Sequence, residues 1–123
     1  MNRVYSYYGK AHKVIDGDTV EIIVDVGFTI SVRERFRLLG INAPEMKGPT
    51  AEAGEAARAF LASLIEGREI TVASHGRDKY GRWLAVLLVD DVSDERVNVN
   101  QMMVAKGHAV RYMEDRIPKA LGF

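Results

Sequence analysis

Ile15-Asp16-Gly17-Asp18-Thr19 separates two segments of the chain that are rich in valine and isoleucine. The Asp-Gly pair is a strong signal for a tight hairpin, because both central residues of a type I′ turn need a positive φ. A hairpin joins antiparallel strands, whereas parallel strands need a long crossover, so a doubly wound parallel sheet does not fit this part of the chain. We therefore expect two antiparallel strands, over residues 11–15 and 19–26.

A third run of strand character follows over residues 28–39. Its apolar residues alternate with polar ones and are predicted to share one face of a strand: Phe28, Ile30, Val32, Phe36 and Leu38. Arginines occupy the opposite face at positions 33, 35 and 37. For Arg33 and Arg35 we expect surface positions, paired with a glutamate on the neighbouring strand.

The spacing of the apolar residues changes to three and four after Thr50, which is a good N-terminal helix cap. This pattern predicts a helix that ends at Gly67. Residues 69–73 and 83–89 return to strand character, and a second helix is expected from an Asn98 cap to Lys106. The predicted order is three strands, a helix, two strands and a helix. It indicates an α+β fold built on a five-stranded OB-fold barrel, whose loops and exposed face commonly hold oligonucleotides.

Composition limits the class of protein further. The 123 residues, of which 47% are hydrophobic, suit a single domain over residues 1–123. With 17 basic and 17 acidic residues the formal net charge is zero, so any attraction to nucleic acid must be local. No apolar stretch is long enough to span a membrane, and no signal peptide is visible. We expect a soluble, cytoplasmic monomer, or a secreted one if a signal has been removed.

Three separate segments contain residue types that suit phosphodiester chemistry. Asp18 directly follows the first turn and has Asp16 nearby, and hard divalent cations prefer such oxygens. Read alone, however, Asp-Gly-Asp-Thr is more often just a turn. Arg37, on the polar face of its strand, can grip two oxygens of a phosphate, and Pro44 makes a stiff corner from which Glu45 emerges.

The third segment, Asp78-Lys79-Tyr80-Gly81-Arg82, lies between the fourth and fifth predicted strands. It places an arginine at the start of a strand and combines a cation with an aromatic ring. Single-stranded nucleic acids use that pair of contacts for backbone and base. Tyr112 offers a second ring, or is an ordinary half-buried tyrosine.

Taken together, residues 15–20, 37–45 and 78–82 resemble the staphylococcal nuclease family, and the likeness extends from about residue 13 to residue 112. The resemblance implies an OB-fold nuclease that depends on calcium. It also implies hydrolysis of DNA and RNA, preferably single-stranded, to products with 3′-phosphate ends.

The resemblance implies three groups of site residues: metal ligands (Asp18, Asn42 and the carbonyl of Ala43), catalytic residues (Arg37, Glu45 and Arg82) and nucleotide-binding residues (Lys79, Tyr80 and Tyr112). Glu45 would orient or deprotonate the attacking water. Asn42 departs from the family pattern, because the best-known member has an aspartate there, and an amide oxygen brings no charge to the cation.

The alternative is a catalytically weak or inactive OB-fold module that binds single-stranded nucleic acid or a protein partner. Because both arginines and the glutamate are present, the sequence favours the enzyme.

Overall fold

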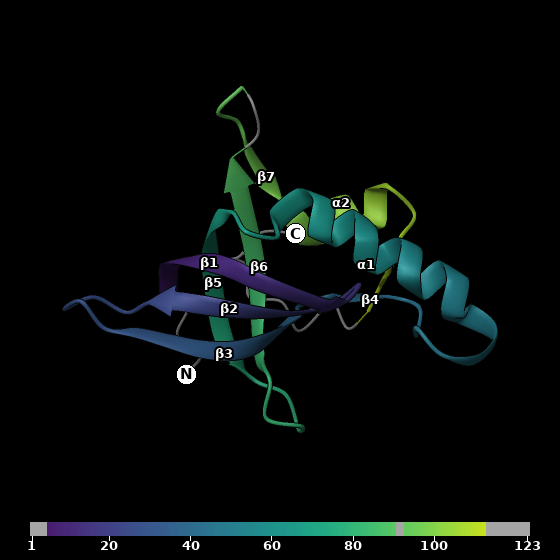
Figure 1. Ribbon diagram of the computed structural model, residues 1–123, viewed down its shortest axis with the longest axis horizontal. Helices are drawn as coiled ribbons and strands as arrows, with labels where there is room; N and C mark the ends of the chain where they lie inside the picture. Colours follow the sequence, from purple (N-terminus) through teal and green to yellow (C-terminus); the bar gives the residue numbers. More distant parts are fainter. Residues whose placement is uncertain (1–4, 91–92, 113–123) are drawn as a thin grey trace.

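A computed structural model describes residues 5–90 and 93–112 (Figure 1). Five strands form a closed barrel: β1 (Tyr5–Asp16), β2 (Thr19–Asp25), β3 (Ser31–Leu38), β5 (Glu69–Arg77) and β6 (Trp83–Asp90). They pair antiparallel in the order β3-β2-β1-β5-β6, and a parallel pairing of β3 with β6 closes the ring. The predicted five-stranded OB-fold barrel is therefore confirmed.

Smaller elements complete the fold: β4 (Ile41–Asn42), the 3₁₀ turn η1 (Gly48–Thr50), α1 (Ala51–Ile65), β7 (Arg96–Asn98), α2 (Val99–Ala105) and β8 (Val110–Arg111). The sequence did not predict β4, β7 or β8. β7 pairs with β6, and β4 pairs with β8, which joins the segment after β3 to the segment after α2. Neither helix in the described part of the chain is long and apolar enough to cross a membrane.

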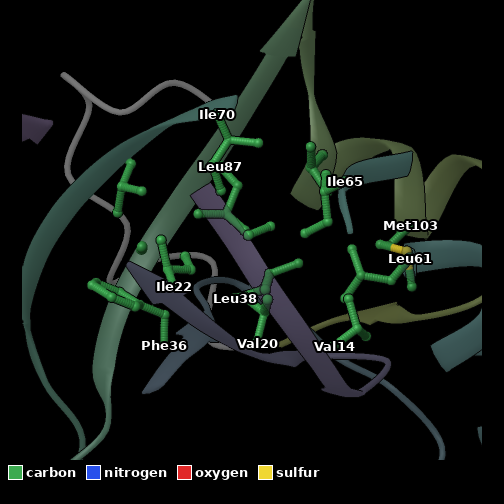
Figure 2. Close-up of a cluster of buried hydrophobic side chains, with 14 of the residues drawn as sticks. Val14, Val20, Ile22, Phe36, Leu38, Leu61, Ile65, Ile70, Leu87 and Met103 are labelled. Atoms are coloured by element: carbon green, nitrogen blue, oxygen red, sulfur yellow. The ribbon is translucent and has the colours of Figure 1, made fainter. Parts of the chain in front are cut away.

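The hydrophobic core fills the barrel and extends to the two helices (Figure 2). Val20 and Ile22 of β2 and Leu38 of β3 are fully buried in it, as are Leu61 and Ile65 of α1. The three-and-four spacing of the sequence thus identified the buried face of α1. Ala53 and Ala56 share this three-and-four spacing in the sequence, but they are exposed.

The first hairpin turn differs from the prediction. Asp16 pairs with Thr19, so the loop consists of Gly17 and Asp18, and the residues described with a positive φ do not include any of positions 16–18. The type I′ assignment was wrong, and an Asx-type bond, in which the Asp18 N–H donates to Asp16 Oδ1 at 3.0 Å, shapes the turn. Glycine is needed at position 17 for space: a Cβ there would lie 2.7 Å from the Cβ atoms of both Ala43 and Ala57. Close packing against α1 and residue 43 therefore fixes where Asp18 lies.

The outer half of the third run was also predicted wrongly. β3 begins only at Ser31, Phe28 has a φ of 54°, and its side chain is 93% exposed. Ile30 and Val32 are exposed as well, and only the inner apolar residues of the strand reach the core. The reason is that the β2–β3 hairpin projects beyond the barrel, on the side away from the helices, where alternating apolar residues have no core to face (Figure 1).

The two predicted helix caps had different outcomes. Thr50 makes no side-chain bond to an N–H of α1, and its Oγ1 instead donates to the carbonyl of Glu45 at 2.8 Å. Asn98 is the N-cap of α2, because its Oδ1 accepts the N–H of Gln101 at 3.0 Å. The Thr50 side chain therefore fixes the loop before α1 and does not cap the helix.

Candidate active site

A cavity of about 930 Å³ is lined by all nine of the site residues implied by the resemblance. They come from the β1–β2 turn, from the end of β3 and the segment after it, from the β5–β6 loop and from the residue after β8. Four carboxylates and four cationic side chains face this space, so it is close to neutral as a whole (Asp16, Asp18, Glu45 and Asp78; Arg37, Arg77, Lys79 and Arg82). The opposite charges are distributed unevenly within it.

Asp18 is the centre of one side of the cavity. Its Oδ2 accepts the N–H of Ala43 at 2.9 Å and lies 3.7 Å from Arg37 Nη2. The same Nη2 donates to Asn42 Oδ1 at 3.1 Å. Two of the residues proposed as metal ligands, Asp18 and Asn42, therefore contact one guanidinium, and the third, Ala43, is bonded to Asp18.

The Asp18 carboxylate has spare capacity to bind a cation. In its ionised form the buried side chain accepts hydrogen bonds from the Thr19 hydroxyl at 3.2 Å and the Ala43 N–H within the described residues, whereas its bond to Asp16 requires a proton. An ionised carboxylate has about four lone-pair sites. The pKa of Asp18 is raised to about 6, mainly by burial. A hydrogen bond to Asp16 and the negative charge of Asp16 also raise it, whereas the Ala43 N–H and the positive charge of Arg37 lower it. Keeping this carboxylate ionised at neutral pH therefore costs the folded protein free energy.

We predict that Asp18→Asn stabilises the protein at pH 7.5 in the presence of chelator, by about 1–3 kcal/mol. The folded form binds the Asp18 proton more tightly than the unfolded form. The stability contributed by protonation is therefore complete below the ordinary pKa of 3.8 and is lost as the pH rises to about 6. Urea unfolding at pH 7.5 and at pH 4 measures the effect, and the two proteins should differ little at pH 4.

Asp78→Asn is the matched control for this substitution. Burial raises the pKa of Asp78, but this effect is outweighed by hydrogen bonds from the backbone N–H groups of Arg82 and Tyr80 and by the Arg82 guanidinium. The net shift of its pKa is therefore downward. Asp78→Asn should therefore destabilise the protein at pH 7.5. Equal losses of stability in both variants would contradict the raised pKa of Asp18 in the folded protein.

Glu45 is positioned by its main chain. Its carbonyl accepts the Thr50 hydroxyl, and a Cβ at Gly54 of α1 would lie 2.4 Å from that carbonyl oxygen. The segment after Pro44 therefore rests directly on the helix backbone, which only a glycine permits. A glycine inside a helix costs about 1 kcal/mol relative to alanine, and this contact explains its presence.

Arg82 is far from the first hairpin turn in the sequence, but its side chain contacts Thr19 beside that turn. Its Nε donates to Asp78 Oδ2 at 2.8 Å, and its Nη1 donates to Thr19 Oγ1 at 3.3 Å. Asp78 thus fixes one edge of the guanidinium. The remaining N–H groups stay available on the cavity side, where two of them can bind a phosphate together.

Aromatic rings border the cavity beside these cations. Lys79 Nζ lies 5.3 Å from the centre of the Tyr80 ring, and Arg37 Cζ lies 5.5 Å from the centre of the Tyr112 ring. Both rings are well exposed, at 72% for Tyr80 and 45% for Tyr112. Tyr112 is therefore a wall of the cavity and not a core residue.

Two residues that shape the site were not predicted from the sequence. Arg77 lines the cavity but precedes the recognised segment by one position. Gly54 was not singled out, although a glycine within an apolar helical pattern is a detectable signal of close backbone contact.

Comparisons with known proteins agree with this geometry. Residues 35–120 match the family described as "Staphylococcal nuclease homologue". The chain is 36% identical over 105 residues to an "Uncharacterized endonuclease" of Escherichia coli O157:H7, which covers 85% of this chain and 61% of the relative.

Two further relatives are similar to the same extent. A "Protein ParB" of Escherichia coli is 35% identical over 108 residues, covering 85% of this chain and 56% of its own. A "Micrococcal nuclease" of Shigella flexneri is 34% identical over 111 residues, covering 86% and 59%. The chain spans about three fifths of the length of these relatives. The family match, which spans more than half of the chain, shows that the chain belongs to the family of staphylococcal nuclease homologues.

Proposed function

We propose that this domain is a metal-dependent nuclease that hydrolyses phosphodiester bonds of DNA and RNA. The observation that supports it best is the meeting of Asp18, Arg37, Glu45 and Arg82 in one cavity, although they come from three separate parts of the chain. Relatives named as nucleases make the same reaction class the natural choice.

The donor set fits a hard divalent cation, and we propose Ca²⁺. Asp18, Asn42 and the Ala43 carbonyl offer oxygen ligands only, which Ca²⁺ prefers, and Asp18 has lone pairs to spare. No group of three or more acidic or histidine side chains that could hold a metal occurs among the described residues, so water must supply part of the coordination. A cation bound there would neutralise charge that develops on phosphoryl oxygens.

The side chains of this chain would perform the rest of the chemistry. Arg37 and Arg82 bind the scissile phosphate and stabilise the added negative charge of the transition state. Glu45 accepts a proton from, or orients, the water whose oxygen forms the new bond to phosphorus. The bond from phosphorus to the 5′ oxygen breaks, a proton from solvent restores the 5′ hydroxyl, and a 3′-phosphate remains.

Exposed rings support a preference for single strands. Tyr80 and Tyr112 offer faces on which unpaired bases can stack, and Lys79 lies beside the first of them. Bases in a duplex are already stacked on one another, so they are not available to these rings.

Incubation with denatured DNA, and separately with RNA, tests the proposal. We expect cleavage in millimolar Ca²⁺ and none with chelator, because without a cation the carboxylates of the cavity repel phosphate. The new DNA ends should resist extension by a polymerase until a 3′-phosphatase has treated them. Binding without cleavage in Ca²⁺ would support the inactive OB-fold module instead, and cleavage that persists in chelator would remove the metal from the proposal.

A further inference from the structure

Arg77 is a third arginine of the cavity, and nothing in the reaction above uses it. It is the last residue of β5 and pairs across the sheet with Trp83, the first residue of β6. Its guanidinium carbon lies 4.2 Å from the centre of the Trp83 ring. Such a cation–π contact holds the guanidinium over the ring face, and Arg77 is exposed and lines the cavity.

These N–H groups have no acidic partner among the described residues. The carboxylate nearest in sequence, Asp78, bonds to other groups: its Oδ1 accepts the N–H groups of Tyr80 at 2.8 Å and of Arg82 at 3.0 Å, and its Oδ2 accepts Arg82 Nε. None of the ion pairs found in the described part of the chain includes Arg77. Its positive charge is therefore not neutralised by a carboxylate of the described residues, and its contact within the fold is with the Trp83 ring.

The cavity is charged unevenly because of this arrangement. The side formed by β5, β6 and the loop between them has three cations and one carboxylate (Arg77, Lys79 and Arg82; Asp78). The opposite side has three carboxylates and one cation (Asp16, Asp18 and Glu45; Arg37). One phosphate bound by Arg37 and Arg82 would leave the charge of Arg77, at the end of β5, unused.

We propose that Arg77, held on Trp83, binds a second phosphate of the same nucleic-acid strand, next to the phosphate that is cleaved. This subsite rests on the proposed function and makes the site selective for oligonucleotides over ligands with a single phosphodiester. Trp83 is the positioning residue of the subsite, because it keeps the guanidinium against the cavity wall.

Binding measurements test the subsite apart from cleavage. The measurements use Glu45→Gln protein with Ca²⁺. Fluorescence anisotropy gives the affinity for a labelled deoxythymidine oligonucleotide of about twelve residues. Competition against it gives the affinity for the dinucleotide, which has one phosphodiester. Arg77→Gln should weaken the oligonucleotide about five-fold and lower the slope of log affinity against log salt by about 0.7. The loss for the dinucleotide should be several-fold smaller.

Arg35→Gln removes the same charge from an exposed position outside the cavity and is the matched control. Arg77→Lys should recover only part of the affinity, because an ammonium does not form the planar contacts of a guanidinium. The proposal is overturned if Arg77→Gln behaves like Arg35→Gln, or if it weakens both ligands equally. Failure of the wild-type protein to cleave would count against the proposed function alone, since this test measures binding.

Discussion

Arg82→Ala is expected to lower kcat/KM on single-stranded DNA by about 10³-fold, because it removes a charge-stabilising donor from the transition state. The position of the side chain supports this magnitude. One edge of its guanidinium is fixed by Asp78 at 2.8 Å and another group reaches Thr19, so the free N–H groups are held in place before substrate arrives. Initial rates with saturating Ca²⁺ measure the effect.

Glu45→Gln, which keeps the shape of the side chain but cannot accept a proton, should lose activity by about 10²–10⁴-fold.

Two controls separate chemistry from folding. Arg33→Ala removes an arginine that pairs with Glu21 at 3.7 Å on the barrel surface, and it should retain nearly full activity. Thermal unfolding of Arg82→Ala should show a modest loss of stability, because Asp78 keeps two backbone N–H donors. A folded Arg82→Ala protein that cleaves within ten-fold of the wild-type rate would contradict the assigned role of Arg82.

The barrel was predictable because its signals are local. Alternation of apolar residues identified the inner parts of the strands, the three-and-four spacing identified α1, and Asn98 identified the start of α2. The same alternation failed at Phe28 and Ile30, because sequence periodicity does not reveal whether a core lies opposite the strand. Two-residue strands such as β4 and β8 leave no periodic signal at all.

The site was predictable only in part for a related reason. A family resemblance named residues that prove to line one cavity, while residues that act through contacts distant in sequence were missed. Gly17 seemed to be required by turn geometry and is instead required by contact with Ala43 and Ala57. Arg77 has meaning only because β5 and β6 place it over Trp83. Such contacts depend on the folded chain and have no signature in a single segment.

Asn100→Ala is expected to cost about 3–5 kcal/mol in the free energy of unfolding, because it leaves buried polar groups without partners. Asn100 is fully buried in α2 and joins two strands. Its Oδ1 accepts the N–H of Leu87 at 3.0 Å, and its Nδ2 donates to the carbonyls of Leu39 at 2.8 Å and Ala85 at 3.0 Å. These groups lie beside the parallel seam where β3 meets β6 and the barrel closes.

Asn98→Ala provides the matched comparison, because it removes the same side chain from the same helix at its partly exposed cap. Loss of a cap costs about 1 kcal/mol, so urea unfolding should rank Asn100→Ala well below Asn98→Ala in stability. If Asn100→Ala does not fold, Asn100→Ser, which retains a hydroxyl, should fold and still rank below Asn98→Ala. Leu39 follows Arg37 by two residues, so the seam that Asn100 holds also fixes the strand end from which Arg37 enters the cavity. Equal stability of the Asn98 and Asn100 variants would show that the seam closes without this side chain.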